Sequence, residues 1–168
     1  MKKVFALIVA ATLCIAANAQ FYVGGSLYFN TNDNTTGFSI APEAGFALNE
    51  TFSVGAILEF DTQKDWYNEF GITPYIRWNA MDFEPLKLFI DGGLTFTSYN
   101  NKITDKTDSA FEIGFRPGFA IPINDNLSFV AHVGFLGFGS NENGVPGVTD
   151  GFALSLNNNI LCGVYYCF

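Results

Sequence analysis

A set of ionisable side chains in the middle of the chain has the chemistry needed for acid–base work or for an ion path. The set comprises Glu43, Glu59, Arg77, Asp91, Glu112, Arg116 and His132. His132 is the only histidine, so a serine nucleophile that needs an imidazole base would have to reach it. Ser128 lies four residues away, about 13 Å along an extended strand, which is too far for a direct hydrogen bond. Ser39, Ser53 and Ser155 would have to approach from other strands, and no local motif marks them.

The elements that would position these side chains are β-strands. After Gln20, apolar residues recur at every second position, and no stretch has a convincing 3.6-residue period. The pattern predicts eight strands, at 21–29, 38–48, 51–61, 69–79, 86–98, 110–123, 127–139 and 151–168. Short turns such as Asn49-Glu50 alternate with longer polar loops near 30–37, 61–68, 99–109 and 140–150. This alternation is typical of an all-β protein that forms an eight-stranded antiparallel up-and-down transmembrane β-barrel.

The two faces of the predicted strands differ in composition. One face carries bulky apolar residues in every strand, for example Phe111, Ile113 and Phe115, with Phe135 in the next strand. In a soluble lipocalin-like barrel this face would point inward, but it would overfill the narrow interior that eight strands enclose. Because such a surface is unfavourable in water, we expect it to meet lipid. The interior is then predicted to hold glycine, serine and a few charges, among them the ionisable set.

Prolines occur within three of the predicted strands. Pro42, Pro74 and Pro117 all fall on the outward phase. Because proline cannot donate a hydrogen bond to the strand ladder, we interpret these positions as local bulges or single missing bonds.

The inward charges are best explained as a polar plug. A buried charge is costly unless it is paired and hydrogen-bonded, so carboxylates, arginines and histidine on neighbouring strands are expected to pair. Eight strands leave little room for a channel. We therefore expect a non-enzymatic barrel, without cofactor or metal, that displays its loops for envelope integrity, adhesion or interaction. The alternatives are a narrow pore gated by the same charges and a lipid-modifying outer-membrane enzyme.

The last nine residues, ILCGVYYCF, carry the most specific motif. Its alternating apolar positions, glycine and terminal aromatic residue are Ile160, Cys162, Gly163, Val164, Tyr166 and Phe168. The segment resembles the C-terminal signal that the outer-membrane assembly machinery reads, although Leu161 stands where that signal usually has a polar residue. With the strand pattern, the chain resembles a small eight-stranded outer-membrane β-barrel of the OmpA/OmpX-like superfamily, barrel domain only.

The resemblance implies a location and a set of partners. It places the barrel in the Gram-negative outer membrane, with both termini periplasmic and the long loops extracellular. It implies contact with outer-membrane lipid and lipopolysaccharide, and with the barrel assembly machinery and periplasmic chaperones during biogenesis. The protein is expected to be a monomer.

The N-terminus has the features of a cleaved signal peptide over residues 1–19, which leaves residues 20–168 as the barrel domain. Lys2 and Lys3 precede an apolar run that ends in small residues. Cleavage would remove these two cations and change the formal charge from −8 to −10. An acidic exported chain without a basic stripe is not expected to bind nucleic acid. Cys162 and Cys167 would lie about 16 Å apart along one strand, beyond disulfide reach.

Overall fold

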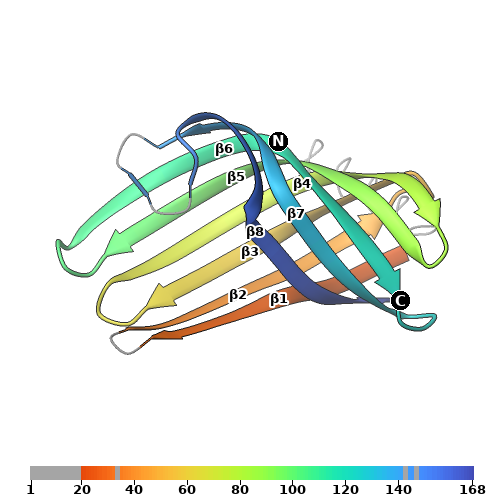
Figure 1. The fold of residues 1–168 in the computed structure, drawn as a ribbon, viewed down its shortest axis with the longest axis horizontal. Coiled ribbons are helices and arrows are strands. Elements are labelled where there is room, and N and C mark those ends of the chain that lie inside the picture. Colours follow the sequence, from red (N-terminus) through yellow and green to blue (C-terminus); the bar gives the residue numbers. More distant parts are fainter. Residues whose placement is uncertain (1–19, 33–34, 142–143, 146–147) are drawn as a thin grey trace, which may run out of the picture.

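The computed structural model describes residues 20–32, 35–141, 144–145 and 148–168, and shows one closed β-barrel (Figure 1). The predicted signal peptide, residues 1–19, lies outside the described residues. The strands are β1 (Gln20–Asn32), β2 (Thr35–Ala47), β3 (Phe52–Gln63), β4 (Tyr67–Phe83), β5 (Leu86–Asn101), β6 (Lys106–Pro122), β7 (Leu127–Ser140) and β8 (Gly151–Cys167). Among the described residues, no helix is long and apolar enough to span a bilayer.

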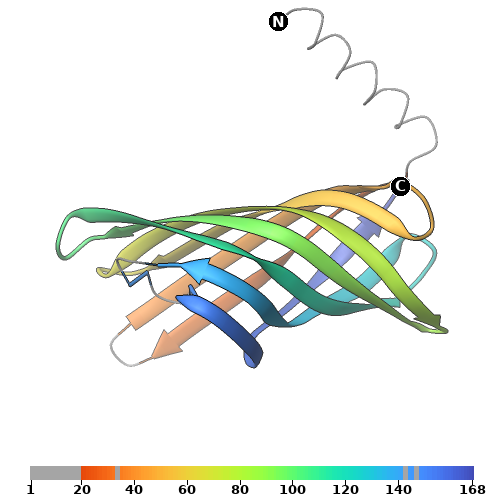
Figure 2. The ribbon, with the colours of Figure 1, turned by 90° about the horizontal axis from the view of Figure 1, so that it is seen from above.

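Each strand pairs with its neighbours in the chain in antiparallel register, and β1 pairs with β8 to close the barrel. The fold class predicted from the sequence is therefore confirmed. Figures 1 and 2 show that the turns after β2, β4 and β6 gather at one end of the barrel, together with the C-terminus. We call this the turn end, and the opposite end, where β3 meets β4 and β5 meets β6, the hairpin end.

At the hairpin end the strands are longer than the apolar pattern predicts. The loops expected at 61–68 and 99–109 shrink to residues 64–66 and 102–105, because polar residues continue the ladder. Thr62 faces Asn68 and donates a 2.7 Å hydrogen bond to its side-chain oxygen. Asn100 faces Thr107 in the same way, at 3.1 Å. Alternation of apolar residues marks only the part of a strand that meets an apolar medium, so it ends before the strand does.

The prolines interrupt the ladder on one side only. Pro42 pairs with β1, Pro74 with β3 and Pro117 with β5. Toward the following strand, paired residues are missing beside Pro42 and Pro74, and the register shifts beside Pro117. The structure thus agrees with the interpretation of these positions as missing bonds or bulges.

The outer face is apolar, as predicted, and Phe135 is the exception among the side chains that the structure describes. Ile76, Phe96 and Phe115 expose 50 to 59% of their surface on the outside of the barrel. Phe135 was expected there as well, but it is 5% exposed and lies inside. The register of β7 against β8 shifts between Val133 and Phe135, and Gly134 between them has a φ of 81°, which favours glycine. This bulge turns the next side chain to the opposite face.

The interior also differs from the expected glycine, serine and charges because it contains aromatic rings, which lie on glycines of the neighbouring strand. Tyr75 faces Gly55 in the register, and Phe89 faces Gly118. The other pairs of this kind are Tyr22 with Gly45, Tyr165 with Gly24, and Phe135 with Gly114; the Phe135 ring also lies over Gly137 of its own strand. Glycine in a strand often marks such a close approach. The missing side chains make room for large rings in a narrow lumen.

We expect Gly55→Ala to destabilise the barrel by about 1 to 3 kcal/mol, the usual cost of extra atoms in a packed interior. A Cβ at this position would lie 2.5 Å from the Tyr75 hydroxyl oxygen and 2.7 Å from the backbone oxygen of Ala44. Gly92→Ala is the matched control on the outer face, where the added Cβ would lie 3.4 Å from the Phe115 ring. Urea titration of the refolded protein in detergent measures both variants, and equal losses would contradict the packing described.

Candidate functional site

The charged side chains predicted to face the lumen do so, and the strand register decides which of them meet. Arg77 on β4 faces Asp91 on β5, and Asp91 faces Arg116 on β6. Glu43, Arg77, Asp91 and His132 come together in the half of the barrel near the turn end, where each is buried. We call these four residues, with Tyr22, Tyr75, Phe89 and Tyr165 around them, the Arg77 cluster.

Arg77 is the centre of this cluster. Its Nε donates to Oδ1 of Asp91 at 2.7 Å and its Nη2 donates to Oδ2 at 2.8 Å, the bidentate geometry that makes arginine–carboxylate pairs strong. The same Nη2 donates to Oε1 of Glu43 at 3.2 Å. Because one guanidinium lies between two carboxylates and only 8% of its side chain is exposed, its charge is compensated within the lumen.

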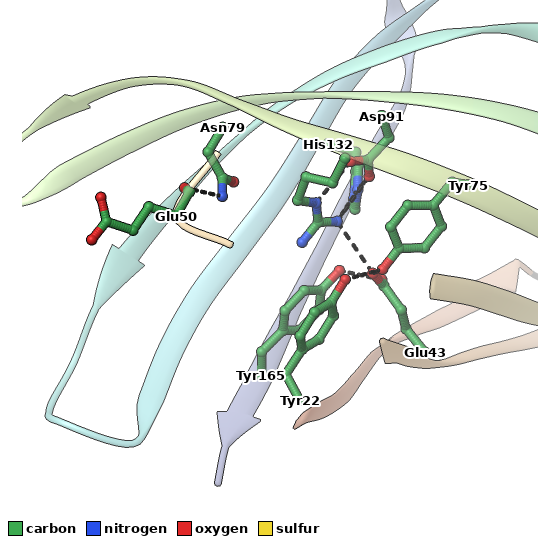
Figure 3. A network of polar contacts seen from close by, with 9 residues as sticks. Tyr22, Glu43, Glu50, Tyr75, Asn79, Asp91, His132 and Tyr165 are labelled. Atoms are coloured by element: carbon green, nitrogen blue, oxygen red, sulfur yellow. Dashed lines mark hydrogen bonds and ion pairs between the residues drawn. The ribbon is translucent and has the colours of Figure 1, made fainter. Parts of the chain in front are cut away.

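Glu43 also accepts hydrogen bonds from two tyrosines. The hydroxyls of Tyr75 and Tyr165 donate to its two carboxylate oxygens. The hydroxyl oxygen of Tyr22 lies 2.6 Å from that of Tyr75. The Tyr22 ring stacks on the Tyr165 ring with 5.7 Å between the two centroids. Figure 3 shows the three tyrosines converging on the Glu43 carboxylate. These contacts connect β1, β2, β4 and β8 through the middle of the lumen.

His132 joins the cluster from β7. Its Nε2 lies 2.8 Å from Oδ2 of Asp91 and 3.3 Å from Nη2 of Arg77, and its ring meets Phe89 edge-on at 5.3 Å. No hydrogen bond connects His132 to a serine hydroxyl among the described residues. In the same part of the chain, no group of histidine, cysteine and carboxylate side chains has the arrangement of a metal site. The geometry around His132 is therefore that of a member of an ion-pair network.

Four aromatic rings surround the Arg77 guanidinium. Its central carbon lies 3.9 Å from the centre of the Phe89 ring. The corresponding distances are 5.2 Å for Tyr75, 5.5 Å for Tyr165 and 5.7 Å for Tyr22. All four are within the range of cation–π attraction, which is strongest where water is excluded. The rings therefore stabilise the charge and also fill the space around it.

The remaining predicted charges form a second group nearer the hairpin end. Arg116 donates to Thr95 Oγ1 at 2.9 Å and lies 3.9 Å from Glu112. Glu112 accepts a hydrogen bond from the backbone of Thr149 at 2.9 Å. Glu59 lies over Gly71 instead of approaching Arg77. The ionisable set expected from the sequence is thus divided into two groups along the barrel axis.

The second group lines a cavity of about 300 Å³. Its carboxylates are Glu59, Asp61, Glu69 and Glu112, with Arg116 and His132 at its inner end. Asp61 and Glu69 are direct partners in the register, so two like charges face each other across one strand pair. The cavity is acidic and reaches the Arg77 cluster at His132, whereas two other spaces beside the cluster are only about 10 Å³ each.

Sequence reasoning missed the aromatic half of the Arg77 cluster. Tyr22, Phe89 and Tyr165 were not among the expected site residues. The alternation of inward and outward positions along a strand could have identified them. Phe89 precedes Asp91 by two residues, so it must share the inward face. Tyr22 and Tyr165 stand in the same relation to the inward glycines Gly24 and Gly163.

The C-terminal segment closes the barrel. Residues Gly163–Cys167 pair with Tyr22–Ser26 of β1, and the backbone N–H of Phe168 donates to the carbonyl of Phe21 at 3.0 Å. Val164, Tyr166 and Phe168 are exposed on the outer face, as is Cys162. The side chain of Ile160 lies outside the described residues. The C-terminal motif is therefore the part of β8 that pairs with β1, and it presents apolar side chains outward.

The chain matches no protein-family profile and no curated protein sequence. Among solved structures it is similar to the neisserial surface protein A (NspA), with 11% identity, a TM-score of 0.59, and coverage of 89% of this chain and 97% of that one. A major outer membrane protein of Thermus thermophilus is similar at 15% identity (TM-score 0.49; coverage 90% and 100%). Ail, the attachment invasion locus protein of Yersinia pestis, is similar at 12% (TM-score 0.42; coverage 89% and 95%). The likeness to NspA confirms the fold of a small eight-stranded outer-membrane barrel.

Removing the Arg77 guanidinium should be far more costly than removing an exposed cation. We expect Arg77→Ala to destabilise the protein by about 3 to 5 kcal/mol, because it leaves two buried carboxylates without their partner. Lys87→Ala is the control, since Lys87 pairs with Asp82 at 3.3 Å on the surface and such pairs contribute about 0 to 1 kcal/mol. Urea midpoints of the two variants in the same detergent provide the comparison. Similar losses in both would show that the cluster does not stabilise the barrel.

Proposed function

We propose that this protein is an integral barrel of the Gram-negative outer membrane whose lumen is closed by the Arg77 cluster. Such a barrel acts through the loops that it displays, in envelope integrity, adhesion or interaction. It neither conducts ions nor catalyses a reaction. The observation that carries this proposal is the filling of the lumen by Arg77, its two carboxylates and the four surrounding rings. NspA, whose fold is similar, is named as a surface protein, which is consistent with the same class of role.

Closure of the lumen follows from size and from energy. Beyond the acidic cavity, two spaces beside the cluster have volumes of about 10 Å³ each, which is close to the minimum that holds one water molecule. Every buried side-chain nitrogen and oxygen in the described residues has a hydrogen-bond partner. Opening a path would separate Arg77 from Asp91 or Glu43 in a poorly solvated interior, and this is unfavourable. A solute entering the acidic cavity would therefore stop at Arg77 and His132.

The proposed orientation places the turn end in the periplasm and the hairpin end outside the cell. Short periplasmic turns and longer extracellular connections are the rule for barrels of this class. The turn end carries both ends of the barrel domain, Gln20 and Phe168, which matches removal of residues 1–19 on the periplasmic side. The edge Gly163–Cys167 would be the part that the assembly machinery recognises, after periplasmic chaperones have delivered the chain.

The proposed surroundings are lipid on the wall and lipopolysaccharide at the outer rim. The described part of the wall presents bulky apolar side chains on its strands, which suits a barrel surrounded by lipid, and we expect it to be a monomer. Lysines at the hairpin end, Lys64, Lys102 and Lys106, are exposed in a chain that is otherwise acidic. They would face the phosphates of lipopolysaccharide. Nucleic acid is not an expected partner of such a surface.

Planar-bilayer recording tests the proposed closure. The purified protein should give at most rare, small conductance steps at neutral pH. The double variant Glu43→Ala/Arg77→Ala, which empties the centre of the cluster and keeps Asp91 next to His132, should give frequent larger steps. Heat-dependent gel mobility verifies that both proteins are folded before recording. Sustained large steps from the unmodified protein would favour the pore alternative, and a folded but silent double variant would show that another structure closes the lumen.

A further inference from the structure

The outer wall of the barrel has a hollow over its later strands. A groove of about 690 Å³ crosses β4, β5, β6, β7 and the start of β8, toward the hairpin end. Its walls are apolar and consist of Ile76, Leu94, Ile113, Phe115, Leu136 and Phe152. These side chains expose between 37 and 75% of their surface, so the groove is open to whatever surrounds the barrel.

The groove has a local cause in the sequence. Gly92 occupies an outward position of β5, directly between Ile76 and Phe115 in the register. Bulky side chains on both sides and none in the middle produce a notch. Next to it, Gly93, Gly114 and Gly137 face one another across three strands; their side-chain positions point into the lumen, so their backbone forms the floor of the groove.

The chemistry of the groove selects a hydrocarbon ligand. Its lining includes no carboxylate, basic or amide side chain, and the one hydroxyl, on Tyr75, points into the lumen and donates to Glu43. A ligand can therefore be recognised only by shape and by dispersion contacts, which are the main source of specificity between apolar surfaces in a membrane. The groove is also continuous with the lipid-facing wall. A concave surface does not complement itself, so a two-fold contact between identical copies is not favoured there.

We propose that this groove holds one acyl chain of an outer-membrane lipid in a fixed position, independently of the lipid headgroup. The inference rests on the membrane location proposed above and adds to it an ordered lipid site. Gly92 is the determinant of the site, because any larger side chain there would occupy the notch.

The test compares lipid retention by two variants that add the same side chain to the outer wall. Gly92→Leu fills the notch, and the fold should tolerate it because a Cβ at this position makes only an ordinary 3.4 Å contact with Phe115. Ala44→Leu is the matched control, since Ala44 is exposed on β2 and does not line the groove. Each protein is refolded in vesicles of phosphatidylethanolamine, with or without added lipid A, then extracted in mild detergent and analysed by native mass spectrometry.

We expect one lipid to remain bound to the wild-type protein and to Ala44→Leu, with either lipid, and the bound fraction to fall severalfold in Gly92→Leu. Equal retention by all three proteins would overturn the proposal. Retention of lipid A alone would overturn the claim that the chain and not the headgroup is recognised. A wild-type dimer that Gly92→Leu separates would assign the groove to a second copy instead. Failure of all three proteins to insert into vesicles would count against the proposed membrane location itself, so the two failures are distinguishable.

Discussion

The buried guanidinium of Arg77 is the charge around which the lumen is organised. A single cation in this environment needs compensation, and Asp91 and Glu43 supply it at distances of 2.7 to 3.2 Å. Each carboxylate is in turn held by further donors, the tyrosine hydroxyls on Glu43 and His132 on Asp91. The network therefore involves six of the eight strands. The charged residues and His132 come from β2, β4, β5 and β7, Tyr165 of β8 donates to Glu43, and Tyr22 of β1 bonds to the Tyr75 hydroxyl. Its contacts cross the barrel and not only adjacent strands, so they fix the shape of the lumen as a whole.

The alternation of side chains along each strand determines which residues face the lumen and which face outward. Apolar side chains point outward at alternate positions, and the positions between them must suit a narrow interior. Glycine is used for both purposes. Inside, Gly55 makes room for the ring of Tyr75, whereas outside, the missing side chain of Gly92 opens a groove. Closure of the lumen and contact with lipid thus depend on the same alternation, because it places one set of side chains inside and the other set outside.

The sequence was sufficient to predict the strands, their order and the face on which each charge lies, because these depend only on local alternation. It was not sufficient to predict which charges meet. Arg77 pairs with Glu43, whereas Glu59 lies over Gly71. Which carboxylate reaches Arg77 depends on the stagger between strands that are not adjacent in the chain. Phe135 was placed on the wrong face because one bulge at Gly134 reverses the alternation. The ends of the strands were missed because most of their residues are polar, as in the pairs Thr62 with Asn68 and Asn100 with Thr107, so apolar alternation does not mark them.

A double-mutant cycle at Arg77 and Asp91 tests the central claim most directly, since it measures whether the two residues stabilise the fold through each other. The free energies of unfolding of Arg77→Leu, Asp91→Leu and the double variant are compared with wild type in the same detergent. Arg77→Leu leaves Asp91 and Glu43 without their cation, and Asp91→Leu leaves Arg77 with Glu43 as its remaining carboxylate. The double variant should therefore lose less stability than the sum of the two single losses, with a coupling of about 1 to 3 kcal/mol. Additive losses would contradict the account, because they would mean that the buried ion pair does not hold the lumen together.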